Sequence, residues 1–192
     1  MALKIDRPVV LASASPSRKM LLEKAGVEFE VIVSGVDETV PAEYTPAQTV
    51  ETLARRKGEA VFALHPDRPI IAADSVVSID GMILGKPKDD EDAKATLRRL
   101  SGRTHELITG VCLLANGKSE VFHQVTQVTF YPLSEEEIGE YVTMGESRGR
   151  AGSYGIEGIG VVLVQSIQGD YSNIVGLPVA ETLRRLRDLM KA

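Results

Sequence analysis

A short apolar run that passes at once into a capped helix is the feature that most constrains the fold of this chain. Residues 9–12 are apolar, and the polar stretch 13–18 (Ser-Ala-Ser-Pro-Ser-Arg) follows without a spacer. Ser15 suits a helix N-cap and Pro16 the first helical position, while Gly26 suits the C-terminal stop. The pattern predicts a buried strand that leads directly into a helix, which is the basic unit of an α/β fold.

Strand and helix signals continue to alternate along the chain, with hairpins between them. Thr45-Pro46 predicts a second helix, whose apolar stripe is Val50, Leu53, Ala54, Val61 and Leu64. Asp80-Gly81 and Asn116-Gly117 predict tight hairpins. Further strands are expected at 29–33, 69–73, 104–114, 120–130, 161–167 and 171–175, and further helices after Asp89 or Asp90, Ser134 and Pro178. This mixture predicts an α/β fold with a mixed, twisted sheet and flanking helices.

Composition narrows the class of protein. With 192 residues, 43% of them apolar, the chain suits a single globular domain over residues 1–192. The 22 Lys and Arg against 27 Asp and Glu argue against binding to a nucleic-acid backbone. No apolar run approaches the ~20 residues of a membrane span, and Lys4, Asp6 and Arg7 interrupt any signal peptide, so we expect a cytoplasmic protein without a membrane partner. Cys112, the only cysteine, lies among apolar residues and is expected to be a buried, inert thiol.

The strand-to-helix turn is a candidate anion site. A helix N-terminus offers unpaired N–H groups and the positive end of the helix dipole. Ser13, Ser15 and Ser17 add hydroxyl groups, and Arg18 adds a planar guanidinium that matches phosphate oxygens. The alternative is a capped helix with a surface arginine. A Walker A loop is excluded, because no Gly-Lys-Ser/Thr follows.

Charged residues at other strand and helix positions suggest metal and phosphate chemistry. Lys57 falls on the apolar stripe of the second helix, so it must either extend to solvent or pair with a negative group such as a phosphate. Asp74 is expected to end a strand, and Asp37 and Glu38 follow another. Such carboxylates can hold Mg²⁺ or Mn²⁺ or activate a water molecule. The alternatives are a solvated turn at 37–38 and a surface lysine at Lys86.

Eight segments, in order along the chain, resemble the Maf family. They are residues 11–18 (LASASPSR), 36–39 (VDET), 53–57 (LARRK), 72–77 (AADSVV), 85–87 (GKP), 100–105 (LSGRTH), 151–158 (AGSYGIEG) and 175–178 (VGLP). The resemblance implies a nucleoside triphosphate pyrophosphatase that uses a divalent cation. It also implies two lobes around a central cleft, as in inosine-triphosphatase-like enzymes. Members have been linked to removal of non-standard nucleotides and to restraint of cell division.

The resemblance also implies roles for individual residues. The proton acceptor of the family falls on Asp74, a further catalytic acid on Glu38, and phosphate contacts on Ser13, Arg18, Lys57 and Lys86. Asp74 and Glu38 are the expected ligands of Mg²⁺ or Mn²⁺, and Lys57 and Lys86 join them as catalytic candidates. The expected substrate-binding residues are Ser13, Ser15, Ser17, Arg18, Ser75 and Glu157.

Three positions thought to sort the family by base are Ser17, Ser75 and Glu157 in this chain. By this resemblance, the dTTP/UTP group carries Arg, Thr and Gln at these positions, and the 7-methyl-GTP group carries Trp, Gln and Glu. The chain matches neither group completely. We expect hydrolysis of a nucleoside triphosphate to the monophosphate and pyrophosphate, on dTTP/UTP or modified nucleotides. A non-catalytic nucleotide-binding regulator of cell division and a phosphatase that releases inorganic phosphate are the alternatives. The sequence does not give the oligomeric state, and a homodimer is one possibility.

Overall fold

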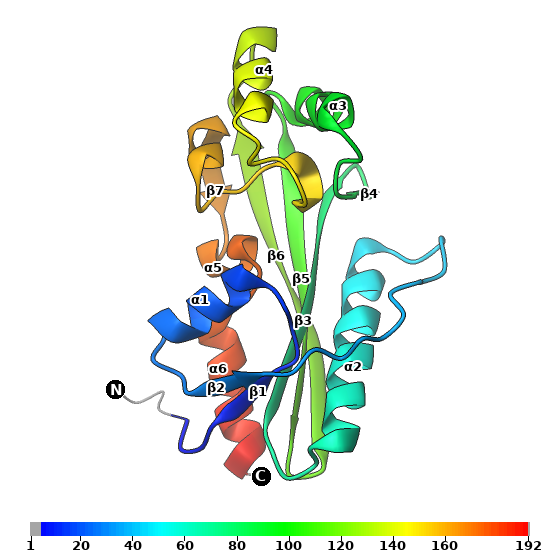
Figure 1. Cartoon of the computed structure of the whole chain (residues 1–192), viewed down its shortest axis with the longest axis vertical. Helices are drawn as coiled ribbons and strands as arrows, with labels where there is room; N and C mark the ends of the chain where they lie inside the picture. Colours follow the sequence, from blue (N-terminus) through cyan, green and yellow to red (C-terminus); the bar gives the residue numbers. More distant parts are fainter. Residues whose placement is uncertain (1–4, 192) are drawn as a thin grey trace. The chain divides into compact units, whose positions relative to one another are not determined.

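Strands and helices follow one another largely as the sequence predicts (Figure 1). The computed structural model describes residues 5–191. Its strands are β1 (Val9–Leu11), β2 (Phe29–Val31), β3 (Ile70–Ile79), β4 (Met82–Leu84), β5 (Thr104–Ala115), β6 (Lys118–Phe130) and β7 (Val164–Gln168). Its helices are α1 (Pro16–Lys24), α2 (Pro46–Leu64), α3 (Asp90–Leu100), α4 (Glu135–Thr143), α5 (Tyr171–Val175) and α6 (Val179–Lys191), with 3-10 helices η1 (Ala151–Ser153) and η2 (Ile159–Leu163). Side-chain caps at Ser15, Thr45, Asp89 and Ser134 confirm the predicted helix starts.

Within residues 5–191, seven strands join one mixed sheet in the order β2-β1-β3-β5-β6-β7, with β4 paired to β3. Strand β1 runs parallel to β2 and β3, whereas the β3–β4 and β6–β7 pairs are antiparallel. Positive φ angles at Asp80, Gly81, Asn116 and Gly117 form the two predicted tight turns. The predicted α/β fold with a mixed sheet and flanking helices is confirmed.

Contacts divide the chain into two compact units. The first comprises residues up to Ser75, residues 109–124 and the C-terminal part from Gly176, and the second comprises residues 76–108 and 125–175. Strands β3, β5 and β6 each contribute residues to both units. No helix within residues 5–191 combines the length and the apolar character that crossing a bilayer would require.

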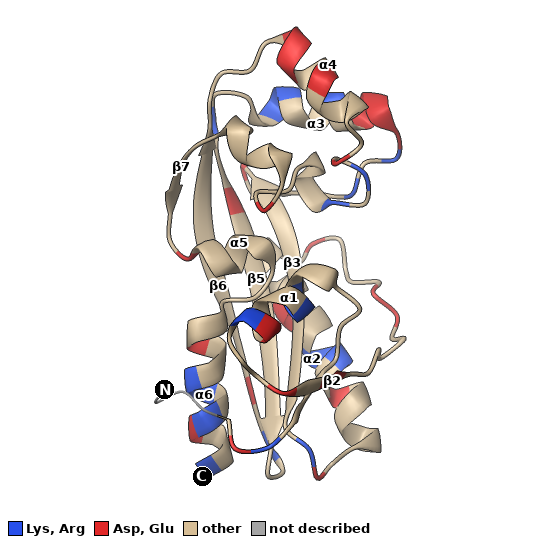
Figure 2. Cartoon of the chain, turned by 60° about the vertical axis from the view of Figure 1, so that its left-hand side comes forward, with Lys and Arg blue, Asp and Glu red and all other residues tan. Residues whose placement is uncertain are grey.

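In the first unit, α2 lies on one face of the sheet, and α1 and α6 lie on the other (Figures 1 and 2). Val10, Ala72 and Cys112 form one core cluster with Ala54 and Val61 of α2. Because side chains alternate along a strand, the neighbouring residues of the same strands belong to the face of α1 and α6. Cys112 is buried, as predicted, and burial raises the pKa of its thiol to about 12.

Two glycines let α2 lie close to the sheet. A Cβ atom on Gly58 would lie 2.8 Å from Leu114 Cδ1 and 3.0 Å from Cys112 Sγ. A Cβ atom on Gly110 of β5 would overlap the backbone of Val50. The backbones of α2 and β5 are therefore in direct contact, with no side chain between them.

A buried aromatic cluster lies in the second unit. The rings of His105, Phe130 and Tyr154 meet edge to face, with centroids 4.8 to 5.5 Å apart. His105 Nε2 lies 2.8 Å from the Tyr154 hydroxyl, and burial lowers the pKa of His105 to about 4. The imidazole is therefore neutral at physiological pH, and it ties the 151–158 segment to β5. In the same unit, α3 packs against α4 and η1.

The prediction that Asp74 ends a strand is wrong, because β3 continues from Ile70 to Ile79. Aspartate has a low intrinsic preference for strands. It is tolerated here because Asp74 and Ser75 both find polar partners within the first unit.

Two other local predictions are also wrong. Residues 171–175 form helix α5 instead of a strand, because Asp170 Oδ1 accepts hydrogen bonds from the backbone and hydroxyl of Ser172 and so favours a helix start. Residues 161–163 belong to η2, and the strand begins only at Val164. Leu64, the last residue of the predicted stripe, is 74% exposed at the end of α2.

The close contact at Gly110 gives a test of the first unit. Gly110→Ala is expected to lower the free energy of unfolding by about 1–3 kcal/mol, because the added methyl group must displace α2. Urea denaturation followed by circular dichroism measures the change. Gly139→Ala in α4 is the control, since its Cβ atom meets nothing within 4 Å and alanine favours a helix. Equal stability of Gly110→Ala and the unmodified protein would contradict the packing described above.

Candidate active site

The predicted anion site forms at the start of α1. The Ser15 hydroxyl caps the helix by accepting from the backbone N–H of Arg18, and Pro16 is the first helical residue. Ser13 Oγ accepts from the backbone N–H of Ser15 and from Arg18 Nη1, at 3.2 and 3.0 Å. Because its oxygen already accepts two hydrogen bonds, the Ser13 hydroxyl proton is suited to donate to another acceptor, such as a phosphate oxygen.

Arg18 is a buried residue, not the surface arginine of the alternative interpretation. Its Nε donates to the carbonyl of Gly176 at 2.8 Å, and Nη1 and Nη2 donate to Ser13 and Ser75. Burial lowers the pKa of the guanidinium, and the nearby Asp74 and Glu38 charges oppose that shift. A guanidinium has five N–H donors, so these three bonds leave one N–H on each terminal nitrogen for a ligand.

The Ser75 hydroxyl links Arg18 to the next strand. Ser75 Oγ accepts from Arg18 Nη2 at 2.9 Å and lies 2.8 Å from Thr109 Oγ1 of β5. Thr109 is fully buried and was not identified from the sequence. The signal that could have marked it is a polar residue between the apolar pairs 107–108 and 111–112 of a predicted buried strand.

Lys57 lies between two carboxylates of the first unit. Its Nζ is 2.6 Å from Asp74 Oδ1 and 2.8 Å from Glu38 Oε1. The side chains of Lys57 and Asp74 are only 12% and 14% exposed, whereas that of Glu38 is 61% exposed. The stripe therefore placed Lys57 correctly in the interior, and its partners in the structure are carboxylates of this chain.

The segment that carries Glu38 is held by a second basic residue of α2. Arg56 Nη1 donates to the carbonyl of Thr39 at 2.6 Å and to that of Asp37 at 3.4 Å. Asp37 Oδ1 accepts from the backbone and hydroxyl of Thr39, and these bonds lower the pKa of its carboxyl group. Asp37 is thus engaged in the turn, while Glu38 reaches Lys57. The sequence did not indicate Arg56, since nothing in the pattern separates it from other surface arginines.

Consecutive residues of β3 join the two polar groups. Side chains alternate along a strand, so Asp74 lies on the α2 face of the sheet and Ser75 on the α1 face. The β1–β3 register ends at Leu11, opposite Ile71. Both groups therefore adjoin the place where β1 has ended and the chain turns into α1.

The carboxylate oxygens of the site suit a divalent cation that binds together with a phosphate group. Asp74 and Glu38 supply carboxylate oxygens on the same side of α2. Among residues 5–191, no group of three or more His, Cys, Asp or Glu residues could hold a metal ion by itself. Mg²⁺ commonly binds through one or two carboxylates and completes its shell with water and substrate phosphates. The chemistry of the two carboxylates therefore fits the expected Mg²⁺ or Mn²⁺.

Two predicted site residues belong to the second unit. Lys86 is exposed in the segment after β4. Glu157 lies in the glycine-rich segment, where its carboxylate pairs with Arg150 Nη1 at 3.3 Å. Glu146 organises this segment by accepting from the backbone N–H groups of Ile159 and Gly160 at 3.0 and 2.7 Å.

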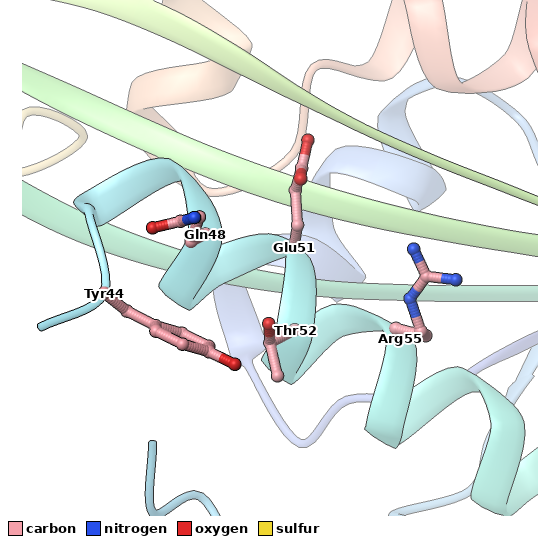
Figure 3. Close-up of a pocket in the computed structure, with 5 residues that line it drawn as sticks. All are labelled: Tyr44, Gln48, Glu51, Thr52 and Arg55. Atoms are coloured by element: carbon pink, nitrogen blue, oxygen red, sulfur yellow. The ribbon is translucent and has the colours of Figure 1, made fainter. Parts of the chain in front are cut away.

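A surface pocket on α2 is separate from these groups (Figure 3). Its walls are polar side chains of α2 and the residue before its cap, namely Tyr44, Gln48, Glu51, Thr52 and Arg55. None of the predicted site residues lines it.

Comparison with known proteins shows which family the chain resembles along its length. The model of the family described as Maf-like protein matches residues 8–189. A dTTP/UTP pyrophosphatase of Bacillus cytotoxicus is 50% identical over 178 residues, which are 93% of each chain. One of Bacillus mycoides is 48% identical over 181 residues, covering 94% of this chain and 95% of the relative. The Ham1 protein of Staphylococcus aureus is a solved structure with 17% identity and a TM-score of 0.44, covering 70% of this chain and 90% of its own.

The family model spans nearly the whole chain, and the two relatives match the chain along almost their full length. The chain belongs to the Maf family.

Proposed function

We propose that this chain is a nucleoside triphosphate pyrophosphatase that hydrolyses UTP and dTTP to the monophosphate and pyrophosphate. The observation that carries the proposal is the pair Asp74-Ser75, whose side chains connect a Lys57–Glu38 group to an Arg18–Ser13 group. The first group offers carboxylates for water activation and for a cation, and the second offers donors for phosphate. Relatives at about half identity carry the name dTTP/UTP pyrophosphatase, which supports the substrate.

The phosphates are bound by donors of α1 and α2. The N-terminus of α1, the Ser13 hydroxyl and the two remaining N–H groups of Arg18 provide a positive, hydrogen-bonding surface. The Lys57 ammonium contacts two carboxylates in the nucleotide-free structure, and its N–H donors also suit a phosphate oxygen. Ser15 contributes through its cap, which fixes the first turn of the helix.

Asp74 is the general base of the proposed reaction. Among the described residues, the partner of its carboxylate is Lys57, on Oδ1, and Oδ2 accepts the proton of a water molecule. The water oxygen forms a bond to the α-phosphorus, and the bond from that phosphorus to the bridging oxygen breaks. Pyrophosphate leaves with the bond electrons. A Mg²⁺ or Mn²⁺ ion held by Asp74 and Glu38 would neutralise charge on the triphosphate.

Asp74→Asn tests the base. The amide should leave the fold intact and lower kcat by about 10²–10⁴-fold, since it cannot take the proton of water. The assay measures pyrophosphate and inorganic phosphate separately with UTP and dTTP. Asp80→Asn is the matched control, because Asp80 is an exposed aspartate that pairs with Arg103 at 2.8 Å. Wild-type kcat in Asp74→Asn would remove Asp74 from this role.

The products distinguish the proposed reaction from the alternatives. Release of inorganic phosphate would indicate a phosphatase. Tight binding of UTP without turnover by the unmodified protein would indicate a regulator that only binds nucleotides.

Removal of divalent ions gives a second test. Treatment with EDTA is expected to abolish pyrophosphate release, because the negative charge on the triphosphate and on two carboxylates is then left without its cation. Addition of Mg²⁺ or Mn²⁺ should restore activity, whereas K⁺ at equal ionic strength should not. Full turnover in EDTA would contradict the proposed role of Glu38 and Asp74 as ligands.

For the second unit, we propose that Lys86 contributes to phosphate binding and that Glu157 reads the base. Glu157→Gln should raise kcat/KM for UTP and dTTP relative to GTP and 7-methyl-GTP by about tenfold, since an amide can both donate to and accept from uracil or thymine. Steady-state kinetics on the four nucleotides measures the ratio, with Glu136→Gln on the exposed face of α4 as the control. Unchanged ratios would show that Glu157 does not read the base.

A further inference from the structure

The Lys57 ammonium contacts both of the carboxylates that are proposed to bind the divalent cation. Its Nζ lies within 2.8 Å of oxygens from both Asp74 and Glu38, the two residues proposed to hold the divalent cation. No other Lys or Arg in the described part of the chain forms an ion pair with either carboxylate. A single, largely covered amine therefore lies where these two carboxylates converge.

Two carboxylates that are held close together repel each other unless a cation lies between them. Asp74 is 14% exposed, so water screens its charge poorly. Lys57 supplies the opposing charge and holds both oxygens at contact distance. Its ammonium is a compact charge on a flexible four-carbon stem, so it can leave this point by rotation of its own side chain, without movement of α2.

We infer that Lys57 is a positioning residue that occupies the place of the divalent cation in the nucleotide-free protein and yields it when the triphosphate arrives. The inference rests on the proposed function. The divalent cation alone must displace an ammonium that is already paired with two carboxylates. When a triphosphate is present, the displaced ammonium gains phosphate oxygens as new partners. Binding of the cation and binding of the triphosphate are therefore coupled, and each favours the other.

The decisive measurement is Mn²⁺ affinity, which does not require turnover. Free Mn²⁺ is followed by its electron paramagnetic resonance signal as protein is titrated, with and without α,β-methylene-UTP. Lys57→Met should bind Mn²⁺ about tenfold more tightly than the unmodified protein when no nucleotide is present. The gain in Mn²⁺ affinity caused by the analogue should also be smaller in Lys57→Met. Lys57→Gln, which is uncharged but polar, should change both quantities in the same direction.

Matched variants separate this role from general effects of charge or packing. Lys94→Met removes another lysine that pairs with a carboxylate, Glu91, at 2.7 Å, and should leave Mn²⁺ affinity unchanged. Asp74→Asn and Glu38→Gln should each weaken Mn²⁺ binding. Thermal unfolding confirms that each variant is folded before titration.

The inference would be overturned if both Lys57 variants bind Mn²⁺ no more tightly than the unmodified protein does, or too weakly to measure. Pyrophosphate release by the unmodified protein is measured on the same samples. If it is normal while the Lys57 variants bind Mn²⁺ no more tightly, the positioning role fails and the proposed function stands. If the unmodified protein releases no pyrophosphate, the proposed function fails, and tighter Mn²⁺ binding in the variants would still support the exchange of ammonium for metal.

Discussion

The parallel pairing of β1 with β3 is the constraint on which the candidate site depends. Parallel strands end at the same edge of a sheet, so the chain leaves β1 for α1 beside the middle of β3. The register sets Val10 opposite Ile70, which in turn fixes the faces on which Asp74 and Ser75 project. A slip of one residue in β3 would exchange those faces and separate each side chain from its partner.

Lys57 and Arg18, the two cations of the candidate site in the first unit, are stabilised in different ways. Lys57 is balanced by two carboxylates, whereas the direct partners of Arg18 are neutral oxygens of Ser13, Ser75 and Gly176. The guanidinium therefore keeps its positive charge next to the positive end of α1. Donors for an anion collect on the α1 face of the sheet, and acceptors for a cation collect on the α2 face. This separation of charge suits a substrate that carries phosphate and metal together.

Local signals predicted much of this arrangement. Capping residues and Asn-Gly or Asp-Gly turns act over a few residues, so they located α1, α2 and both hairpins, and the apolar stripe placed Lys57 in the interior. The local sequence patterns could not predict contacts between distant segments. The partners that keep Asp74 inside a continuous strand come from distant segments, and so do the bonds of Thr109 and Arg56. The division into two units also arises from contacts between segments that no local pattern reports.

The glycines under α2 have a consequence for how the sequence can change. Gly110 meets α2 at Val50 and Gly58 meets the sheet at Leu114, so the helix touches the sheet at two points about 12 Å apart along its axis. Close contacts at two points along the helix restrain its tilt against the sheet. The height of Lys57, the neighbour of Gly58, above Asp74 therefore depends on the main-chain contact at Gly110 and on the Leu114 and Cys112 side chains under Gly58. A larger side chain at either glycine or at Cys112 would push α2 away from the sheet and lengthen the distance between the Lys57 amine and the Asp74 carboxylate.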